Sequence, residues 1–189
     1  RGLLGELTGN LDRLRAQLMQ EAVPQGAVAM AAILGLDDDA VRAVCAAAEA
    51  ELSGEVAEAV NFNSPGQVVI AGSAAAIARA AELAKEAGAK RALPLPVSVP
   101  SHCRLMQPAA AKLAAALQDT AFRQPEIRVI HNADVAAYTD IAQIKGALVR
   151  QLYSPVRWTE TVALLVQEGI TESAACGPGK VSPRSAKHI

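Results

Sequence analysis

The chain has few of the residues that mark several common classes of protein. Only 3 % of its 189 residues are aromatic, and its cysteines, Cys45, Cys103 and Cys176, are odd in number and show no C-x-x-C spacing. Neither a disulfide framework nor a zinc site is therefore indicated. No apolar run approaches the roughly 20 residues that cross a bilayer, and no secretory signal is evident. These absences predict a cytoplasmic protein with no membrane partner.

An excess of charge of either sign is also missing. The sequence has 18 Lys+Arg against 19 Asp+Glu, which gives a formal net charge of -1. A protein that neutralises nucleic-acid phosphates needs a clustered basic face, so we expect no nucleic-acid partner. Hydrophobic residues make up 51 % of the chain, mostly as alanine and aliphatic side chains. The length suits one domain, or one domain with a small inserted lobe.

The first twenty residues have the spacing of a helix with one buried stripe. Leu11, Leu14 and Leu18 recur at three- and four-residue intervals, and Arg15 falls inside their stripe. One interpretation is an arginine whose stem is buried and whose head reaches water. The other is a guanidinium directed into a cleft, where it can bind a carboxylate in a bidentate manner.

Residues 27–97 have the order of a two-layer lobe. We expect strands at 27–34, 56–63, 67–71 and 91–97, and helices at 37–50 and 73–88, the second capped by Ser73 and ended by Gly88. The order strand, helix, strand, strand, helix, strand is the ferredoxin-like arrangement. About 70 residues are enough for such a lobe to have its own core.

After residue 100 the pattern changes to alternating helices and strands. Helices are expected at 105–117, 141–152 and 159–167, a strand at 127–130 and a weak strand from Ile170. The loop at 177–179 is too short for a phosphate loop, and the tail at 182–185 is expected to be poorly ordered. We therefore divide the chain at 1–26, 27–97 and 98–189, and assign it to the α/β class with an inserted α+β lobe.

His102 is the candidate residue with the clearest chemistry. It follows a proline-bounded run and precedes a helix, a position where a neutral imidazole could serve as a general base; a surface histidine is the alternative. On an extended chain the side chains of His102 and Cys103 point to opposite sides, which makes a base–nucleophile pair of the two awkward. We therefore interpret Cys103 as a structural thiol. Gln151 ends a helix, and its backbone carbonyl is an acceptor available to an imidazole N–H. His131 and His188 have no metal-ligand spacing.

Two further features concern binding and the nucleophile. Asn61 and Asn63 lie on one face of a predicted strand, where they could hold a substrate or cap the turn at Pro65. The sequence has no G-x-S-x-G, the strained turn that would present a serine nucleophile.

Six separate blocks of the sequence can be compared with known families. They are MQEAVP at 19–24, NFNSPGQ at 61–67, GAKRA at 88–92, PVSVPSHC at 96–103, QLYSPVRW at 151–158 and GPGKV at 177–181. In order and spacing these blocks resemble the malonyl-CoA:acyl carrier protein transacylases of bacterial type II fatty acid synthesis. The resemblance runs from about residue 14 to residue 181.

The resemblance implies part of an α/β-hydrolase-like core with a ferredoxin-like lobe inserted into it. It implies transfer of malonyl from malonyl-CoA, through a serine ester, to the phosphopantetheine thiol of acyl carrier protein, by a monomer without metal or cofactor. By position His102 matches the base, Gln151 the residue whose main-chain carbonyl orients it, and Arg15 the arginine that pairs with the malonate carboxylate. Asn63 is a weaker candidate for substrate contact.

The sequence departs from the family at the nucleophile. Leu3 stands where the serine of the family's turn is expected, so the chain corresponds to a fragment of an enzyme or to a degenerate copy, and we expect it to be catalytically inactive by itself. Three alternatives remain: an acyltransferase of a polyketide synthase, a non-catalytic module that binds acyl carrier protein, and a plain ferredoxin-like regulatory domain. The last gives no account of the blocks after residue 100.

Overall fold

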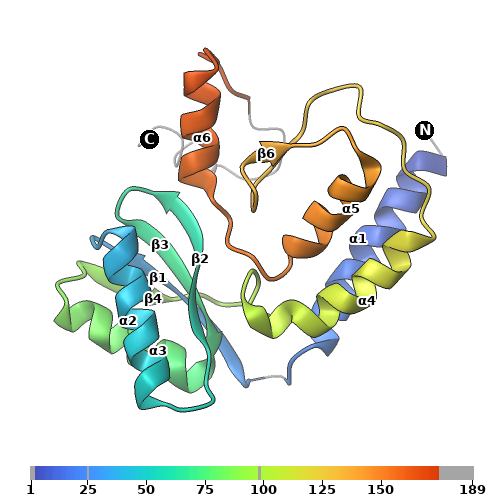
Figure 1. Cartoon of the computed structure of the whole chain (residues 1–189). Coiled ribbons are helices and arrows are strands. Elements are labelled where there is room, and N and C mark those ends of the chain that lie inside the picture. Colours follow the sequence, from blue (N-terminus) through green and yellow to red (C-terminus); the bar gives the residue numbers. More distant parts are fainter. Residues whose placement is uncertain (1–2, 25, 98, 175–189) are drawn as a thin grey trace.

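The computed structural model describes residues 3–24, 26–97 and 99–174, with side chains from Asn10 onward. Its smaller part is an open antiparallel sheet with two helices (Figure 1). The strands lie in the order β2-β3-β1-β4, and each neighbouring pair is antiparallel. The elements of this part are β1 (Val28–Leu34), α2 (Asp38–Glu51), β2 (Ala57–Ser64), β3 (Gln67–Ser73), α3 (Ala74–Glu86) and β4 (Arg91–Pro94).

Local signals in the sequence set several of these boundaries. The Asp37 side chain accepts a hydrogen bond from the backbone N–H of Ala40 at 2.7 Å and so caps α2. Gly88 follows α3 with a φ of +96°, a conformation that glycine adopts without steric cost. Ser73 stands at the start of α3, but its hydroxyl accepts from the N–H of Val56 at 3.1 Å and makes no cap bond. Ser73 is thus the N-cap residue of α3, as predicted, but its hydroxyl is used by the segment that leads into β2 and not by the helix.

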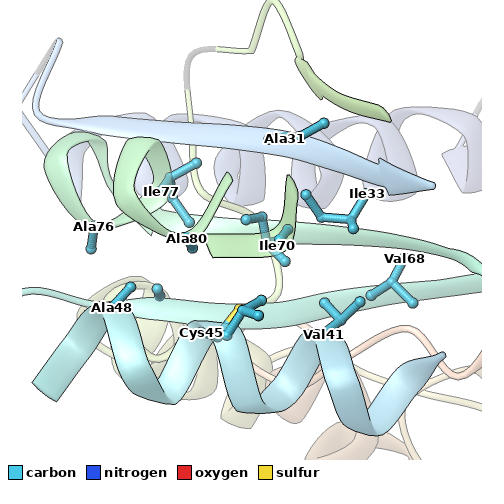
Figure 2. Close-up of a cluster of buried hydrophobic side chains, with 14 of the residues drawn as sticks. Ala31, Ile33, Val41, Cys45, Ala48, Val68, Ile70, Ala76, Ile77 and Ala80 are labelled. Carbon is cyan, nitrogen blue, oxygen red and sulfur yellow. The ribbon is translucent and has the colours of Figure 1, made fainter. Parts of the chain in front are cut away.

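Alternate residues of the strands pack on opposite faces of the sheet. On one face Ile33 and Ile70 pack against α2 and α3 in a cluster of aliphatic and alanine side chains (Figure 2). On the other face Met30, Val60 and Val69 pack against Cys103, which lies beyond the predicted end of the lobe. The sheet thus has a core on both faces, and the second core includes the residues that follow His102.

The larger part is mainly helical. Helix α1 (Leu3–Glu21) packs beside α4 (Gln107–Gln118), and α4 packs on α5 (Ile141–Arg150) (Figure 1). Leu18, Leu113 and Leu152 are buried between them, as the leucine spacing of α1 predicts. A short 3-10 helix, η1 (Arg104–Met106), precedes α4, and α6 (Trp158–Gln167) follows α5. A small hairpin joins β5 (Ile130–His131) to β6 (Ala136–Ala137).

Two predicted strands of the larger part are not formed. Of residues 127–130 only Ile130 belongs to a strand, and Ile127 is 80 % exposed. Residues 170–174 contain no strand. A strand needs a neighbour that accepts its backbone hydrogen bonds, and within the described ranges β5 pairs only with β6. The expected alternation of helix and strand is therefore reduced to helices and one hairpin.

Some of the predictions lie outside the described residues. These are the features predicted at 177–179 and 182–185, together with Cys176 and His188.

The two parts are joined by backbone hydrogen bonds at β2. The N–H of Val156 donates to the carbonyl of Val60 at 2.8 Å, and the N–H of Phe62 donates to the carbonyl of Val156 at 3.0 Å. The Thr159 hydroxyl adds a bond to the Phe62 carbonyl at 3.0 Å. These contacts fix the segment between α5 and α6 along the sheet edge. No helix in the described part of the chain has the length and hydropathy of a membrane span.

Candidate active site

His102 is held on both its backbone and its side chain by the end of α5. Its backbone N–H donates to the carbonyl of Leu152 at 2.9 Å, and its ring Nδ1 lies 2.7 Å from the carbonyl oxygen of Gln151. Its φ is +69°, in the left-handed region that residues other than glycine rarely adopt. The histidine predicted as a base and the carbonyl predicted to orient it are therefore in contact; their roles stay predictions.

The contact with Gln151 sets the protonation of the ring. A carbonyl can only accept, so Nδ1 carries the proton and donates it, which leaves Nε2 free to take a proton from another group. Burial lowers the pKa of His102; the bond to the Gln151 carbonyl raises it in part, and the positive charge of Arg15 lowers it further. The imidazole is thus neutral near pH 7, as a general base must be.

Arg15 reaches the same residue from α1. Its Nη2 donates to the side-chain oxygen of Gln151 at 2.7 Å. The side chain is half-buried, and this burial lowers the pKa of Arg15, while Asp12 on the same helix opposes the shift. A guanidinium stays charged at neutral pH in spite of such a shift. Gln151 therefore binds the imidazole through its main chain and the guanidinium through its side chain.

A cleft of about 510 Å³ opens beside this pair of contacts. Residues of α1, β5, α5 and α6 form its walls, and Arg15 and Gln151 lie among them. Asp12, His131 and Trp158 contribute further polar groups to the walls. The indole Nε1 of Trp158 is a buried donor without a hydrogen-bond partner within the described ranges. A carboxylate that entered this cleft could bind the Arg15 guanidinium through the N–H groups that make no hydrogen bond within the described residues.

Asn63 is not brought into this cleft. It lies half-buried on β2, on the strand that also carries Asn61, and neither residue lines the cleft beside Arg15. Phe62, between them, is buried in the core against α2 and α3. The pairing of β2 with β3 shifts register on both sides of Asn61 and Phe62, so the regular alternation predicted for this strand is interrupted there. The substrate role of Asn63 stays a prediction without a contact to support it.

The described residues contain no group of three or more His, Cys, Asp or Glu side chains that could hold a metal ion. Cys103 is buried, its Sγ donates to the carbonyl of Pro100 at 3.2 Å, and burial raises the pKa of its thiol to about 12. Burial likewise raises the pKa of Cys45 to about 12. Both residues are therefore protonated and inert at neutral pH.

We expect both buried thiols to resist modification in the folded protein. In a Cys176→Ser background, which leaves Cys45 and Cys103, an aromatic disulfide reagent at pH 8 should label neither residue. Both should react once guanidinium chloride has unfolded the chain, because the thiolate is then freely formed. Rapid labelling of Cys103 in the native protein, followed by peptide mass spectrometry, would show that it is a reactive nucleophile instead.

Sequence reasoning missed three residues around the site. Asp12 is three residues before Arg15, and this helical spacing could have placed it on the same wall. His131 ends the short strand β5, and its position after an apolar run was a usable signal. Arg104 binds two carboxylates of the small part, and nothing in the sequence pairs it with residues 46 and 55 positions away.

Comparison with known proteins finds named relatives of the chain. Models of known protein families give no match to the chain. The malonyl CoA-acyl carrier protein transacylase of Haemophilus influenzae is 59 % identical to it over 179 residues, which cover 95 % of this chain and 56 % of that protein. The protein of the same name from Bacillus subtilis is 47 % identical over 177 residues, or 94 % of this chain and 55 % of its own length.

Solved structures agree with these relatives. The acyl-carrier-protein S-malonyltransferase of Burkholderia pseudomallei matches with a TM-score of 0.90 at 56 % identity, over 95 % of this chain and 57 % of that chain. A malonyl-transacylase solved in complex with its type II polyketide synthase acyl-carrier protein matches with a TM-score of 0.92 at 50 % identity, over the same shares.

These matches make the chain a homologue of acyl-transferring enzymes over almost all of its own length. Over that length it is similar to the proteins named malonyl CoA-acyl carrier protein transacylase. The chain spans only a little more than half the length of the curated relatives that it matches.

Proposed function

We propose that this chain forms the part of a malonyl-CoA:acyl carrier protein transacylase that binds malonate and holds the general base. The observation that carries the proposal is the meeting of His102 and Arg15 at Gln151, beside a cleft. A base and a carboxylate-binding cation at one place are what the transfer of a malonyl group requires. The homologues, which are named for this reaction, support the same assignment.

In the proposed reaction a serine hydroxyl attacks the thioester carbonyl of malonyl-CoA. Nε2 of His102 takes the hydroxyl proton and returns it to the coenzyme A thiolate as that group leaves, so a malonyl-serine ester remains. The phosphopantetheine thiol of acyl carrier protein then gives its proton to Nε2 of His102 and attacks the ester carbonyl. The bond to the serine oxygen breaks, and His102 returns the proton to that oxygen, so malonyl leaves as a thioester of the carrier protein. We assign the serine to the portion of the relatives' length that this chain does not span, because no G-x-S-x-G occurs here.

The remaining roles follow from the contacts of the site. The Gln151 carbonyl fixes the ring of His102 in the tautomer that leaves Nε2 free. Arg15 binds the free carboxylate of malonate and rejects acetyl groups, which would leave the guanidinium without a partner. Asn63 is retained as a weaker candidate for substrate contact. The reaction needs no metal or cofactor, because malonyl arrives as an activated thioester.

The fold supports the finer architecture expected from the sequence. We infer that residues 27–97 form a ferredoxin-like lobe, since they follow the order β1-α2-β2-β3-α3-β4 and their sheet has the order β2-β3-β1-β4. We infer that 1–26 and 98–189 belong to a hydrolase-like part. The helices α1, α4 and α5, which pack together from both of these segments, favour this division.

A second function has one specific observation in its favour. The match to a malonyl-transacylase from a type II polyketide synthase, in complex with its carrier protein, is as good as the others. A polyketide synthase role therefore remains an alternative. Separate titrations with the purified acyl carrier protein of fatty acid synthesis and with that of a type II polyketide synthase would distinguish the two functions. Each carrier protein would be tested as acceptor or as binding partner. Binding of a carrier protein without malonyl-CoA binding would instead favour a non-catalytic module.

The test of the proposal is a titration of this chain with acyl-CoA thioesters. We expect calorimetry to show binding of malonyl-CoA in preference to acetyl-CoA, because only malonyl offers a carboxylate to Arg15. We expect intact-mass spectrometry after the same incubation to show no added malonyl group, because the sequence has no G-x-S-x-G turn that would present a serine to His102. Equal binding of both thioesters would contradict the proposed site, and a mass increase of one malonyl group would reveal a nucleophile within these residues.

A further inference from the structure

Consecutive residues of the chain are attached to different parts of the molecule at His102–Arg104. His102 is bonded to Gln151 and Leu152 at the end of α5, in the larger part. Cys103 is fully buried on the second face of the small sheet. Arg104, one residue later, makes all its side-chain hydrogen bonds within the described ranges to the small part. The candidate base therefore lies where the chain passes from one part to the other.

Arg104 is bound at both its backbone and its side chain. One carboxylate oxygen of Glu58, on β2, accepts the backbone N–H of Arg104 at 2.9 Å, and the other oxygen pairs with Nη1. Glu49, on α2, pairs with Nη2 at 2.6 Å and also accepts the N–H of Ala57 at 2.7 Å.

The two carboxylates are partly withdrawn from solvent. The side chains of Glu49 and Glu58 are 26 % and 27 % exposed, while that of Arg104 is 43 % exposed. A cluster of charge-assisted bonds with this burial holds its members more firmly than a lone exposed ion pair does. Residue 104 is thus a fixed point on the small part, two residues after the ring of His102.

The left-handed backbone of His102 needs such a fixed point. A residue other than glycine keeps a positive φ only where its surroundings enforce it. The bonds to α5 fix His102 from one side, and the attachment of the next residues to the sheet fixes it from the other. We propose that Arg104, bound by Glu58 and Glu49, is a positioning residue that keeps His102 in this conformation, with its ring against the Gln151 carbonyl.

This inference refines the proposed function, and its importance for catalysis rests on that function. The test, however, measures the imidazole ring of His102 directly. The proton on Nδ1 of His102 and the imidazole titration are observed by NMR on this chain, with signals assigned by comparison with His131→Gln and His188→Gln. In Arg104→Ala we expect the Nδ1 proton to exchange with water about tenfold faster, because the ring leaves the carbonyl more often. The pKa of His102 should rise, because burial holds it down in the parent protein.

Two further variants decide between positioning and general stability. Glu58→Gln keeps the shape of the side chain but removes its charge, and it should give the same changes as Arg104→Ala in a smaller degree. Arg79→Ala is the matched control. Arg79 also joins carboxylates of two helices, Glu51 on α2 and Glu82 on α3, and within the described residues it makes no hydrogen bond or ion pair to residues 102–104. It should lower the unfolding midpoint and leave the His102 signals unchanged.

The outcomes separate this inference from the proposed function. An unchanged Nδ1 exchange rate and pKa in Arg104→Ala and Glu58→Gln would overturn the inference, and so would equal changes in Arg79→Ala. Failure of the parent chain to bind malonyl-CoA, with the NMR changes present, would count against the proposed function and leave the positioning role of Arg104 intact. Arg15 is the charged group that acts on the His102 ring, and it is unchanged in all these variants.

Discussion

Arg15→Ala is expected to weaken the binding of malonyl-CoA to this chain roughly tenfold to a hundredfold. Hydrogen bonds to a charged group contribute about 1.5 to 3 kcal/mol each, and each 1.4 kcal/mol corresponds to about a factor of ten in affinity. The variant removes the guanidinium that lies in the cleft wall beside Gln151. Acetyl-CoA has no carboxylate, so its binding should be unchanged or slightly improved. Calorimetric titration with each thioester measures both effects.

The matched control is Arg13→Ala, on the same helix. Arg13 is exposed and does not line the cleft, so its loss should leave the preference for malonyl-CoA unchanged. A Gln151→Ala variant is no substitute for this control, because Gln151 contacts both candidate residues. Equal losses of malonyl-CoA and acetyl-CoA binding in Arg15→Ala would show that Arg15 does not recognise the malonyl carboxylate.

Gly72→Ala is expected to destabilise the protein by about 3 kcal/mol, the upper part of the range for overpacked sites. Gly72 lies in β3 beside the start of β2, and a Cβ added there would lie 1.9 Å from the carbonyl oxygen of Val56. That oxygen also accepts the N–H of Ser73 at 2.8 Å, so it cannot move without loss of a hydrogen bond. The unfolding midpoint in urea, followed by far-ultraviolet circular dichroism, measures the effect.

Gly146→Ala provides the comparison. Gly146 lies in α5, and its added Cβ would meet only the tip of the Arg150 side chain, at 3.1 Å. Alanine favours a helix interior over glycine by about 1 kcal/mol, which offsets a small displacement of that flexible side chain. The two variants should therefore differ clearly in stability. A Gly72→Ala protein with the parent midpoint would mean that β2 and β3 are farther apart than described.

Much of the fold follows from local patterns in the sequence. The stripe of Leu11, Leu14 and Leu18 predicted α1 and its buried face, and the structure shows that this face packs on α4. The acidic residues at 37–39 and Gly88 marked ends of helices α2 and α3 where the structure has them. These signals are local, because a capping side chain or a positive φ acts within a few residues.

The rest depends on contacts between distant residues. The bond between Arg15 and Gln151 joins positions 136 residues apart, and no single-sequence pattern encodes it; only the family resemblance indicated that both belong to one site. The strand expected at 127–130 is a different case, because here the sequence predicted an element that the structure does not contain. An apolar run indicates a preference for an extended, buried conformation, but a strand forms only where another strand lies beside it. Within the described ranges the two-residue strand β5, which contains Ile130, has β6 as its only neighbouring strand.

The second core of the small sheet has a consequence for any attempt to transplant the lobe. Met30, Val60 and Val69 pack against Cys103, which lies outside residues 27–97. A recombinant piece cut at residue 97 would leave this layer of aliphatic side chains open to water and prone to self-association. We therefore expect the isolated piece to be less stable than the same residues in the chain, and chimaeras that exchange it between relatives should carry the chain through Met106.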